Sequence, residues 1–319
     1  MTNVGLSYDD VLLVPRKGVL SKRAEADLST ELFRGVEIQM PILSANMPSV
    51  TEGAMAAEMR RLGGLGVIHR FQPVEAQIVQ WKQSGGSAIV SIGVNDGWER
   101  FKQLQAEQID WFCIDVAHGH HQQINNLLTT IKKFNSGYVK VMVGNVATRD
   151  AVLDLIERGA DAIKVGVGPG AACRTREVTG FGVPQFTAVE DCADVAAEYG
   201  IPVVADGGIK NSGDIVKAIA AGASTVMLGK LLAHSNEAAG EGHYYGNASE
   251  QMNGHRAPEG VHGEVPIYGP VEDIIKELLW GVRSGISYAG LTSVMELRDA
   301  CIPYIQVAPG VAAESGTRV

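Results

Sequence analysis

AIKVGVGPGAACRTREVTGFGVPQ (residues 162–185) joins a short apolar run to a glycine-rich loop that presents one cysteine. The apolar run predicts a buried strand, and three glycines within five residues leave the loop backbone open to a ligand, because glycine has no Cβ. Arg174 and Arg176 flank Cys173, and cationic neighbours favour the reactive thiolate. The stretch predicts a nucleophile on an anion-binding loop, although an inert buried cysteine is the plain alternative.

The same pattern, a short apolar run followed by an amphipathic helical segment, recurs along the chain. Eight runs have it: residues 41–45, 65–69, 88–94, 111–117, 140–146, 162–168, 202–208 and 225–230. Helical segments are expected at residues 52–62, 125–134, 149–158, 189–199 and 212–221. Alternating strand and helix predicts a parallel sheet buried on both faces. Eight units favour one closed (β/α)8 TIM barrel over residues 1–319, with a doubly wound open sheet as the alternative.

Polar residues and glycines fall where the predicted strands end. They are Asn46, His69, Asp115, His118, Asn145, Gly168, Asp206 and Gly229. In a closed barrel all of them lie on the C-terminal rim, where active sites of this fold are found. The loops after strands seven and eight carry Asp206-Gly207-Gly208 and Gly229-Lys230, which predicts a phosphate site made of backbone N–H groups. Ordinary βα turns are the alternative there.

Residues 233–263 leave the repeat and lack clear periodicity, which predicts an active-site lid. Its titratable candidates are His243, Tyr244, Tyr245, Glu250, His255, Arg256, Glu259 and His262. The His118-Gly119-His120-His121 cluster lacks the spacing and the extra ligands of a zinc site, so we expect no zinc there.

Composition restricts the classes of function. The net charge of −9 argues against a nucleic-acid surface and against an anionic membrane. No apolar run approaches about 18 residues, so no membrane span is expected. The N-terminus lacks a signal-peptide pattern and the four cysteines are far apart, which is typical of a protein of the reducing cytoplasm.

Several motifs resemble the IMP dehydrogenase/GMP reductase family. The matching stretches are SYDDVLLVP (7–15), SANM (44–47), IDVAHGH (114–120), VGNV (143–146), KVGVGPGAACRTR (164–176), ADGGI (205–209), YYGNASE (244–250) and EG (259–260). They run in order over nearly the whole chain. The block GVGPG-x-x-C-x-T-R, followed by TGFGVPQ, is specific to the family.

The resemblance implies a (β/α)8 barrel, usually a homotetramer, that binds a purine nucleoside monophosphate and a nicotinamide cofactor. Cys173 would attack C2 of the purine and form a covalent intermediate. The loop carbonyls of Gly168, Gly170 and Cys173 would hold a monovalent cation, typically K⁺, and Arg176 belongs to the same predicted metal-binding set.

Two activities of the family compete. IMP dehydrogenase oxidises IMP with NAD and hydrolyses the intermediate with an Arg-Tyr pair on its flap, and the sequence here has Arg256 but no such pair. GMP reductase converts GMP to IMP and ammonia with NADPH, and Thr175 with Glu259 matches its proton-transfer pair. YYGNASE and the absence of a CBS insertion after residues 69–73 also favour the reductase, in purine salvage. A short IMP dehydrogenase and a non-catalytic nucleotide-binding homologue are the alternatives.

The resemblance assigns further contacts. Substrate-binding residues would be Met47, Asp206, Gly207, Gly208, Gly229, Lys230, Tyr245, Gly246, Arg256 and Gly260. Cofactor-binding residues would be Arg23, Arg70, Asp115, Val116, Ala117, Gly144, Asn145, Val167 and Gly168, with Arg23 reaching a neighbouring subunit's cofactor. This chain departs from the family at Ala171, where a phosphate-binding serine is usual, and at Lys230, where a small residue is usual.

Overall fold

The computed structural model describes residues 4–134, 138–249 and 258–308. Eight parallel strands close into a barrel in the order β10-β11-β4-β5-β6-β7-β8-β9. They are β4 (Ile42–Ser44), β5 (Leu65–Ile68), β6 (Ile89–Ile92), β7 (Trp111–Asp115), β8 (Lys140–Val146), β9 (Ala162–Val165), β10 (Val203–Asp206) and β11 (Thr225–Leu228). Each strand lies within one of the eight predicted runs, and closure of the sheet confirms the barrel over the open alternative.

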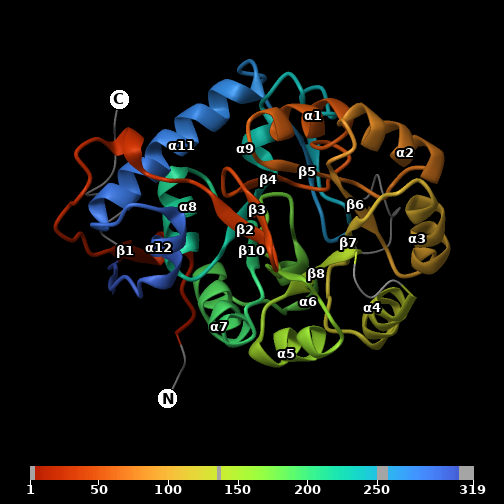
Figure 1. The fold of residues 1–319 in the computed structure, drawn as a ribbon, viewed down its shortest axis with the longest axis horizontal. Helices are drawn as coiled ribbons and strands as arrows, with labels where there is room; N and C mark the ends of the chain where they lie inside the picture. Colours follow the sequence, from red (N-terminus) through yellow and green to blue (C-terminus); the bar gives the residue numbers. More distant parts are fainter. Residues whose placement is uncertain (1–3, 135–137, 250–257, 309–319) are drawn as a thin grey trace.

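Helices follow the strands and form an outer ring around them (Figure 1). They are α1 (Gly53–Arg61), α2 (Val74–Gln83), α3 (Gly97–Ala106), α4 (Gln122–Phe134), α5 (Arg149–Glu157), α6 (Thr175–Thr179), α7 (Gln185–Glu198), α8 (Ser212–Ala220) and α9 (Lys230–Ala233). Side-chain caps fix two of the predicted starts: Thr148 accepts the N–H of Ala151 before α5, and Asn211 accepts the N–H of Asp214 before α8. Helix α7 begins earlier than predicted, directly after Pro184.

The core has two parts. Apolar side chains between the strands and the helices form the larger one, which explains why the strands are apolar on both faces. The smaller part fills the N-terminal end of the barrel, where Leu65, Ile89 and Ala162 start their strands and belong to one apolar cluster. A hairpin of β2 (Thr30–Phe33) and β3 (Val36–Ile38) packs on it as a plug, an element that the periodicity did not predict.

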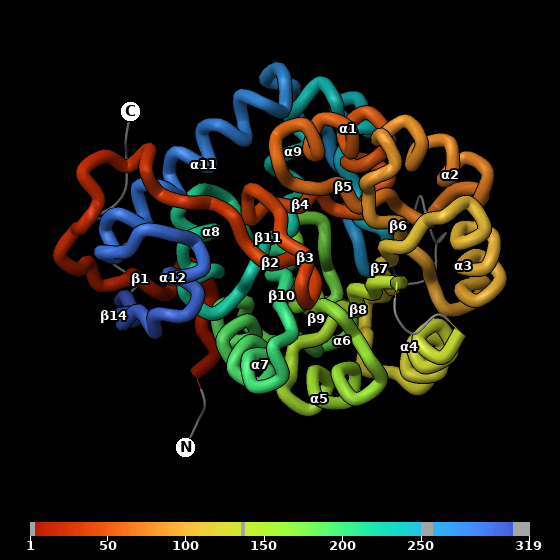
Figure 2. The backbone as a smooth tube through the Cα atoms, in the orientation of Figure 1, coloured from red at the N-terminus to blue at the C-terminus, as the bar shows by residue number. Residues whose placement is uncertain are grey.

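Two segments from opposite ends of the chain pair beside the barrel. Strand β1 (Val11–Leu13) runs antiparallel to β14 (Tyr304–Gln306), so these two segments from near opposite ends of the sequence lie side by side (Figure 2). Between the last barrel unit and β14 come α11 (Val271–Tyr288) and α12 (Val294–Asp299). No helix in the described ranges is both long and apolar enough to cross a membrane.

The predicted lid is partly regular. After α9 the chain forms β12 (His243–Tyr245), which pairs antiparallel with β13 (His262–Glu264). The predicted contact Arg256 lies outside the described residues, as do Glu250 and His255. Glu259 and Gly260, by contrast, are described and reach the loop after β9, where Gly260 forms a bridge with Cys173.

Candidate active site

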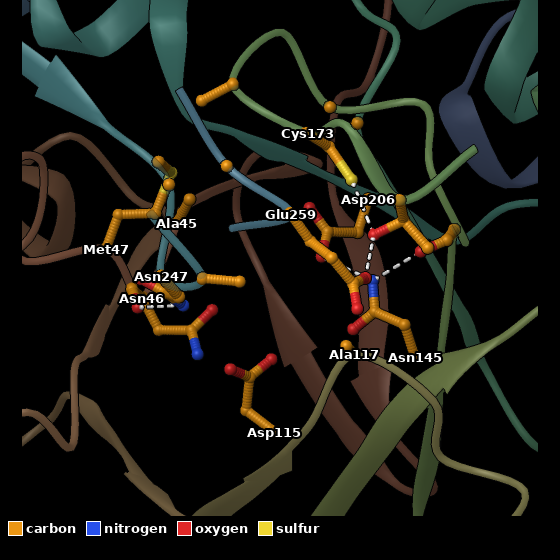
Figure 3. Close-up of a pocket in the computed structure, with 18 of the residues that line it drawn as sticks. Ala45, Asn46, Met47, Asp115, Ala117, Asn145, Cys173, Asp206, Asn247 and Glu259 are labelled. Carbon is orange, nitrogen blue, oxygen red and sulfur yellow. Dashed lines mark hydrogen bonds between the residues drawn. The ribbon is translucent and has the colours of Figure 1, made fainter. Parts of the chain in front are cut away.

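A cavity of about 290 Å³ opens at the C-terminal ends of the strands, on the predicted rim (Figure 3). It gathers predicted residues from six strand ends and from the lid. Those that line it are Met47, Arg70, Asp115, Val116, Ala117, Asn145, Gly168, Gly170, Cys173, Thr175, Asp206, Gly207, Gly246, Glu259 and Gly260. Of the eight rim positions, Asn46 also lines this cavity, whereas His69, His118 and Gly229 do not. His69 is buried and lies 3.4 Å from the Glu52 carboxylate.

A second cavity of about 300 Å³ adjoins the first. Gly208, Gly229, Lys230 and Arg176 line only this second space, whereas Met47, Asp206, Gly207 and Tyr244 line both. The site therefore has two adjoining compartments: a cysteine compartment and a glycine compartment at the loops after β10 and β11.

The cysteine compartment contains a hydrogen-bonded chain. The Cys173 thiol lies 3.2 Å from the Thr175 hydroxyl, which donates to the Glu259 carboxylate at 2.7 Å. Thr175 starts the short helix α6, so the loop places its hydroxyl two residues beyond the cysteine. The Glu259 carbonyl accepts the N–H of Arg174 at 2.6 Å, which fixes the lid residue against the loop. A sulfur and a carboxylate joined through one hydroxyl can carry both nucleophilic attack and proton transfer.

Close backbone contacts explain the glycines of the second compartment. Gly207 and Gly208 have φ values of 95° and 82°, which glycine adopts without strain. A Cβ on Gly207 would meet the Gly170 backbone nitrogen at 3.0 Å, and one on Gly229 would meet the Tyr244 hydroxyl at 3.1 Å. Side chains at these positions would fill the space that the cavity occupies, and exposed Lys230 adds a positive charge at its edge.

A buried lysine, which no sequence pattern singles out, lies between two aspartates of the site. The ammonium of Lys164 on β9 lies 2.8 Å from the carboxylates of both Asp115 and Asp206, and it also contacts the Asn145 side chain. Only 1% of Lys164 is exposed. Burial alone would lower the pKa of Lys164, but the two carboxylates raise it above its ordinary value, so the ammonium stays charged.

The two arginines beside the cysteine have partners of their own. Arg174 pairs with Glu177 at 2.8 Å, and Arg176 donates to the Val183 carbonyl at 2.6 Å. Their effect on the Cys173 thiolate therefore stays a prediction. The Arg176 carbonyl accepts the N–H of Gly180 at 3.1 Å, at the end of α6.

Several predicted contacts lie outside both linings. Tyr245 faces away, with its ring 6.0 Å from that of His262, and Tyr244 takes the cavity position because neighbours on a strand point to opposite faces. Gly144 lies behind the lining, where a Cβ would meet the Lys164 carbonyl at 2.4 Å. Val167 packs against the core.

Of the two arginines predicted to bind the cofactor, one lines a cavity and the other does not. Arg23 lies over the Tyr288 ring, away from both cavities, so its predicted reach to another subunit stays a prediction. Arg70 lines the cysteine compartment with its guanidinium 4.4 Å from the centre of the Phe71 ring. Its buried Nε has no hydrogen-bond partner among the described residues.

The sequence of this chain matches a known protein family. The sequence model of the IMP dehydrogenase / GMP reductase domain matches residues 5–317. The chain belongs to the IMP dehydrogenase/GMP reductase family. Members are oxidoreductases of purine metabolism that act on GMP or IMP with nicotinamide cofactors. Within residues 4–134, 138–249 and 258–308, no group of three His, Cys, Asp or Glu side chains could hold a metal ion.

Individual relatives carry both names. The chain is 36% identical to inosine-5'-monophosphate dehydrogenase of Cryptosporidium parvum, over 92% of this chain and 90% of that protein. It is 31% identical to the enzyme of the same name from Bacillus subtilis, over 92% of each. It is 29% identical to GMP reductase of Leishmania major, over 98% of this chain and 96% of that protein.

Proposed function

We propose that this protein is an NADPH-dependent GMP reductase that converts GMP to IMP and ammonia. The observation that carries the proposal is the hydrogen-bonded chain from Cys173 through Thr175 to Glu259. Reductive removal of the 2-amino group needs a nucleophile that attacks C2 and a proton for the leaving nitrogen. The three hydrogen-bonded side chains offer both within the cysteine compartment.

The residues act in two steps. In the first, the Cys173 thiolate bonds to C2 of GMP, and Glu259 delivers a proton through Thr175 to the 2-amino group, which leaves as ammonia. In the second, C2 receives a hydride and the C2–S bond breaks, which returns the thiolate and releases IMP. In total, GMP, NADPH and two protons are converted to IMP, NADP⁺ and ammonium. Solvent then returns to Glu259 the proton that it gave to the leaving group.

The glycine compartment would hold the nucleotide. Backbone N–H groups near Gly207, Gly208 and Gly229 suit a phosphate, because no side chain blocks their approach. Lys230 would add charge where Ala171 lacks the hydroxyl that is usual in the family. Asp206 lines both compartments, and its carboxylate would accept hydrogen bonds from ribose hydroxyls.

The nicotinamide cofactor would occupy the side of the cysteine compartment that Asp115, Val116 and Ala117 line. When bound, NADPH supplies the hydride. The unpartnered Nε of Arg70 fits a ligand with phosphate oxygens, because a buried donor without a partner costs free energy that such an oxygen would recover.

A potassium ion fits the loop after β9. Backbone carbonyls of Gly168, Gly170 and Cys173 are hard oxygen donors, which a K⁺ ion accepts. The Gly170 carbonyl already accepts the Cys173 N–H at 2.9 Å, and its second lone pair is left for an ion. The ion would stiffen the cysteine loop. We further propose a homotetramer in the cytoplasm, on the family resemblance.

A dehydrogenase that oxidises IMP with NAD is the second candidate. It is favoured by the relatives of that name at 36% and 31% identity. Its chemistry needs a base that activates water, and residues 246–258 contain no Arg-Tyr pair. The reductase remains our proposal because the Thr175–Glu259 pair suits delivery of a proton to ammonia.

Spectrophotometry of the purified chain in K⁺ buffer separates the candidates. We expect NADPH absorbance to fall with added GMP, while ammonia and IMP appear in equal amounts. NADH formation from IMP and NAD in a parallel cuvette would instead establish the dehydrogenase. Thermal stabilisation by GMP without turnover in either cuvette would leave a non-catalytic nucleotide-binding homologue.

A further inference from the structure

One buried ammonium contacts acidic residues from both halves of the site. Lys164 projects from β9, and its partners come from the two neighbouring strands and from the strand beyond β8: Asp206 on β10, Asn145 on β8 and Asp115 on β7. Asn145 also donates to Asp206 at 2.9 Å and to the Gly166 carbonyl at 2.7 Å. The four side chains come from four consecutive strands of the barrel and form one connected network at its rim.

The two carboxylates face different ligand regions. Asp206 lines the wall shared by the cysteine and glycine compartments, where the nucleotide would lie. Asp115 lines only the cysteine compartment, next to Val116 and Ala117 on the side proposed for the nicotinamide. The Lys164 ammonium itself also reaches the lining of the cysteine compartment.

Electrostatics makes this arrangement depend on the lysine. Each carboxylate has an oxygen 2.8 Å from the ammonium, so those two oxygens lie no further apart than twice that distance. Two carboxylates so close in a buried site cannot both stay ionised without a cation between them. Other titratable neighbours of the network are the Cys113 thiol and, near Asp206, the Tyr8 and Tyr244 hydroxyls. Burial raises the pKa of each, so they stay neutral and contribute no charge.

We propose that Lys164 is a positioning residue that couples nucleotide binding to nicotinamide binding by holding Asp206 and Asp115 on one ammonium group. A ligand that orders either carboxylate also fixes the lysine, and the lysine then fixes the other carboxylate. The inference rests on the proposed function for the identity of the two ligands. A purely structural lysine would not affect both ligand affinities with the protein still folded.

Binding measurements test the coupling without turnover. Isothermal titration of the full chain would give dissociation constants for GMP, IMP and NADP⁺, with each nucleotide also titrated in the presence of NADP⁺. We expect Lys164→Gln to weaken both nucleotide and NADP⁺ binding by about tenfold or more. Asp206→Asn should weaken mainly the nucleotide, and Asp115→Asn mainly NADP⁺. Lys132→Met is the matched control, because Lys132 also lies 2.8 Å from an aspartate, Asp161, away from both cavities.

The pH dependence distinguishes positioning from a loss of fold. Without the cation, the two carboxylates of Lys164→Gln repel each other when both are ionised, so its nucleotide affinity relative to that of the wild type should fall as the pH rises. The wild-type protein is the reference at each pH, because the second proton of the nucleotide's own phosphate titrates at about pH 6 and affects all variants alike. In Lys164→Gln/Asp115→Asn a single carboxylate remains, so the fall should disappear; this double variant also replaces the single one if that fails to fold.

Clear results would overturn the inference. A folded Lys164→Gln protein that binds either ligand with wild-type affinity would remove the coupling while leaving the proposed function intact. If the wild-type chain binds neither GMP nor IMP, the proposed function and the coupling fall together.

Discussion

The two ends of the barrel use inward-facing side chains in opposite ways. At the N-terminal end Ile89, Met142 and Ala162 form an apolar cluster with the hairpin residue Phe33. At the C-terminal end the inward positions hold Lys164 with its acidic partners, open to the cavities. Strands β8 and β9 thus carry apolar residues, Met142 and Ala162, toward one end and members of the buried charge network, Asn145 and Lys164, toward the other.

The difference separates stability from chemistry. Apolar burial at the plug stabilises the fold without any requirement for precise geometry of charges. The charged rim contributes little net stability, because desolvation of buried ion pairs costs free energy. It instead orients the side chains that would bind the ligands. Substitutions at the two ends should therefore have separable effects on activity and on stability.

The largest effect is expected at the rim. Cys173→Ala removes the atom proposed to bond to C2, so turnover of GMP should fall by about 10⁴-fold or more while GMP binding and the melting temperature are kept. Coupled assays of NADPH loss, titration of GMP and a thermal melt measure the three quantities. Cys192→Ala, a buried cysteine on α7, is the matched control and should keep its turnover. Residual turnover near the wild-type rate in Cys173→Ala would exclude covalent catalysis.

At the plug the expected effect is on stability alone. Phe33 is fully buried, with its ring 5.8 Å from that of Trp111, so Phe33→Ala should lower the free energy of unfolding by about 3–5 kcal/mol. Urea denaturation measures the loss, and kcat of the folded fraction should not change. Phe181→Ala serves as control because that side chain is 77% exposed. A fall in kcat with unchanged stability would contradict the separation of the two ends.

A smaller effect on turnover is expected from the proton-transfer pair. Glu259→Gln keeps the shape and a hydrogen-bond partner for Thr175 but removes the acid, so kcat should fall by about 10²-fold with KM for GMP little changed. Ammonia release in a single turnover locates the slow step. Glu264→Gln on β13 offers a lid carboxylate outside both linings as control. Equal loss of kcat in both variants would indicate a general effect on the lid.

The sequence predicts those features of the two barrel ends that depend on local periodicity. The eight strands follow from apolar runs, and the rim residues follow because parallel strands end on the same side. The plug hairpin was missed because β2 and β3 are short and belong to no βα unit. Lys164 was missed because a single lysine inside AIKVGVG resembles an ordinary strand residue until three other strands place its partners. The resemblance predicts Tyr245 as a substrate contact, whereas the sequence alone does not show which face of β12 turns toward the cavities. Pairing with β13 turns Tyr244 that way.

The smallest effect concerns the departure at the phosphate site. Lys230 is exposed at the edge of the glycine compartment, so Lys230→Ala should raise KM for GMP by about two- to fivefold and leave kcat unchanged. Because the ammonium would act on the phosphate alone, inhibition by guanosine, which lacks it, should not change. The wild-type KM should also rise with salt, and the rise should be shallower in the variant, since an exposed charge pair is screened. Lys276→Ala on α11, which loses only a surface pair with Glu272, is the control. An unchanged KM and salt response in Lys230→Ala would mean that backbone N–H groups hold the phosphate without this lysine, and that the absence of a serine hydroxyl at Ala171 is not offset by charge.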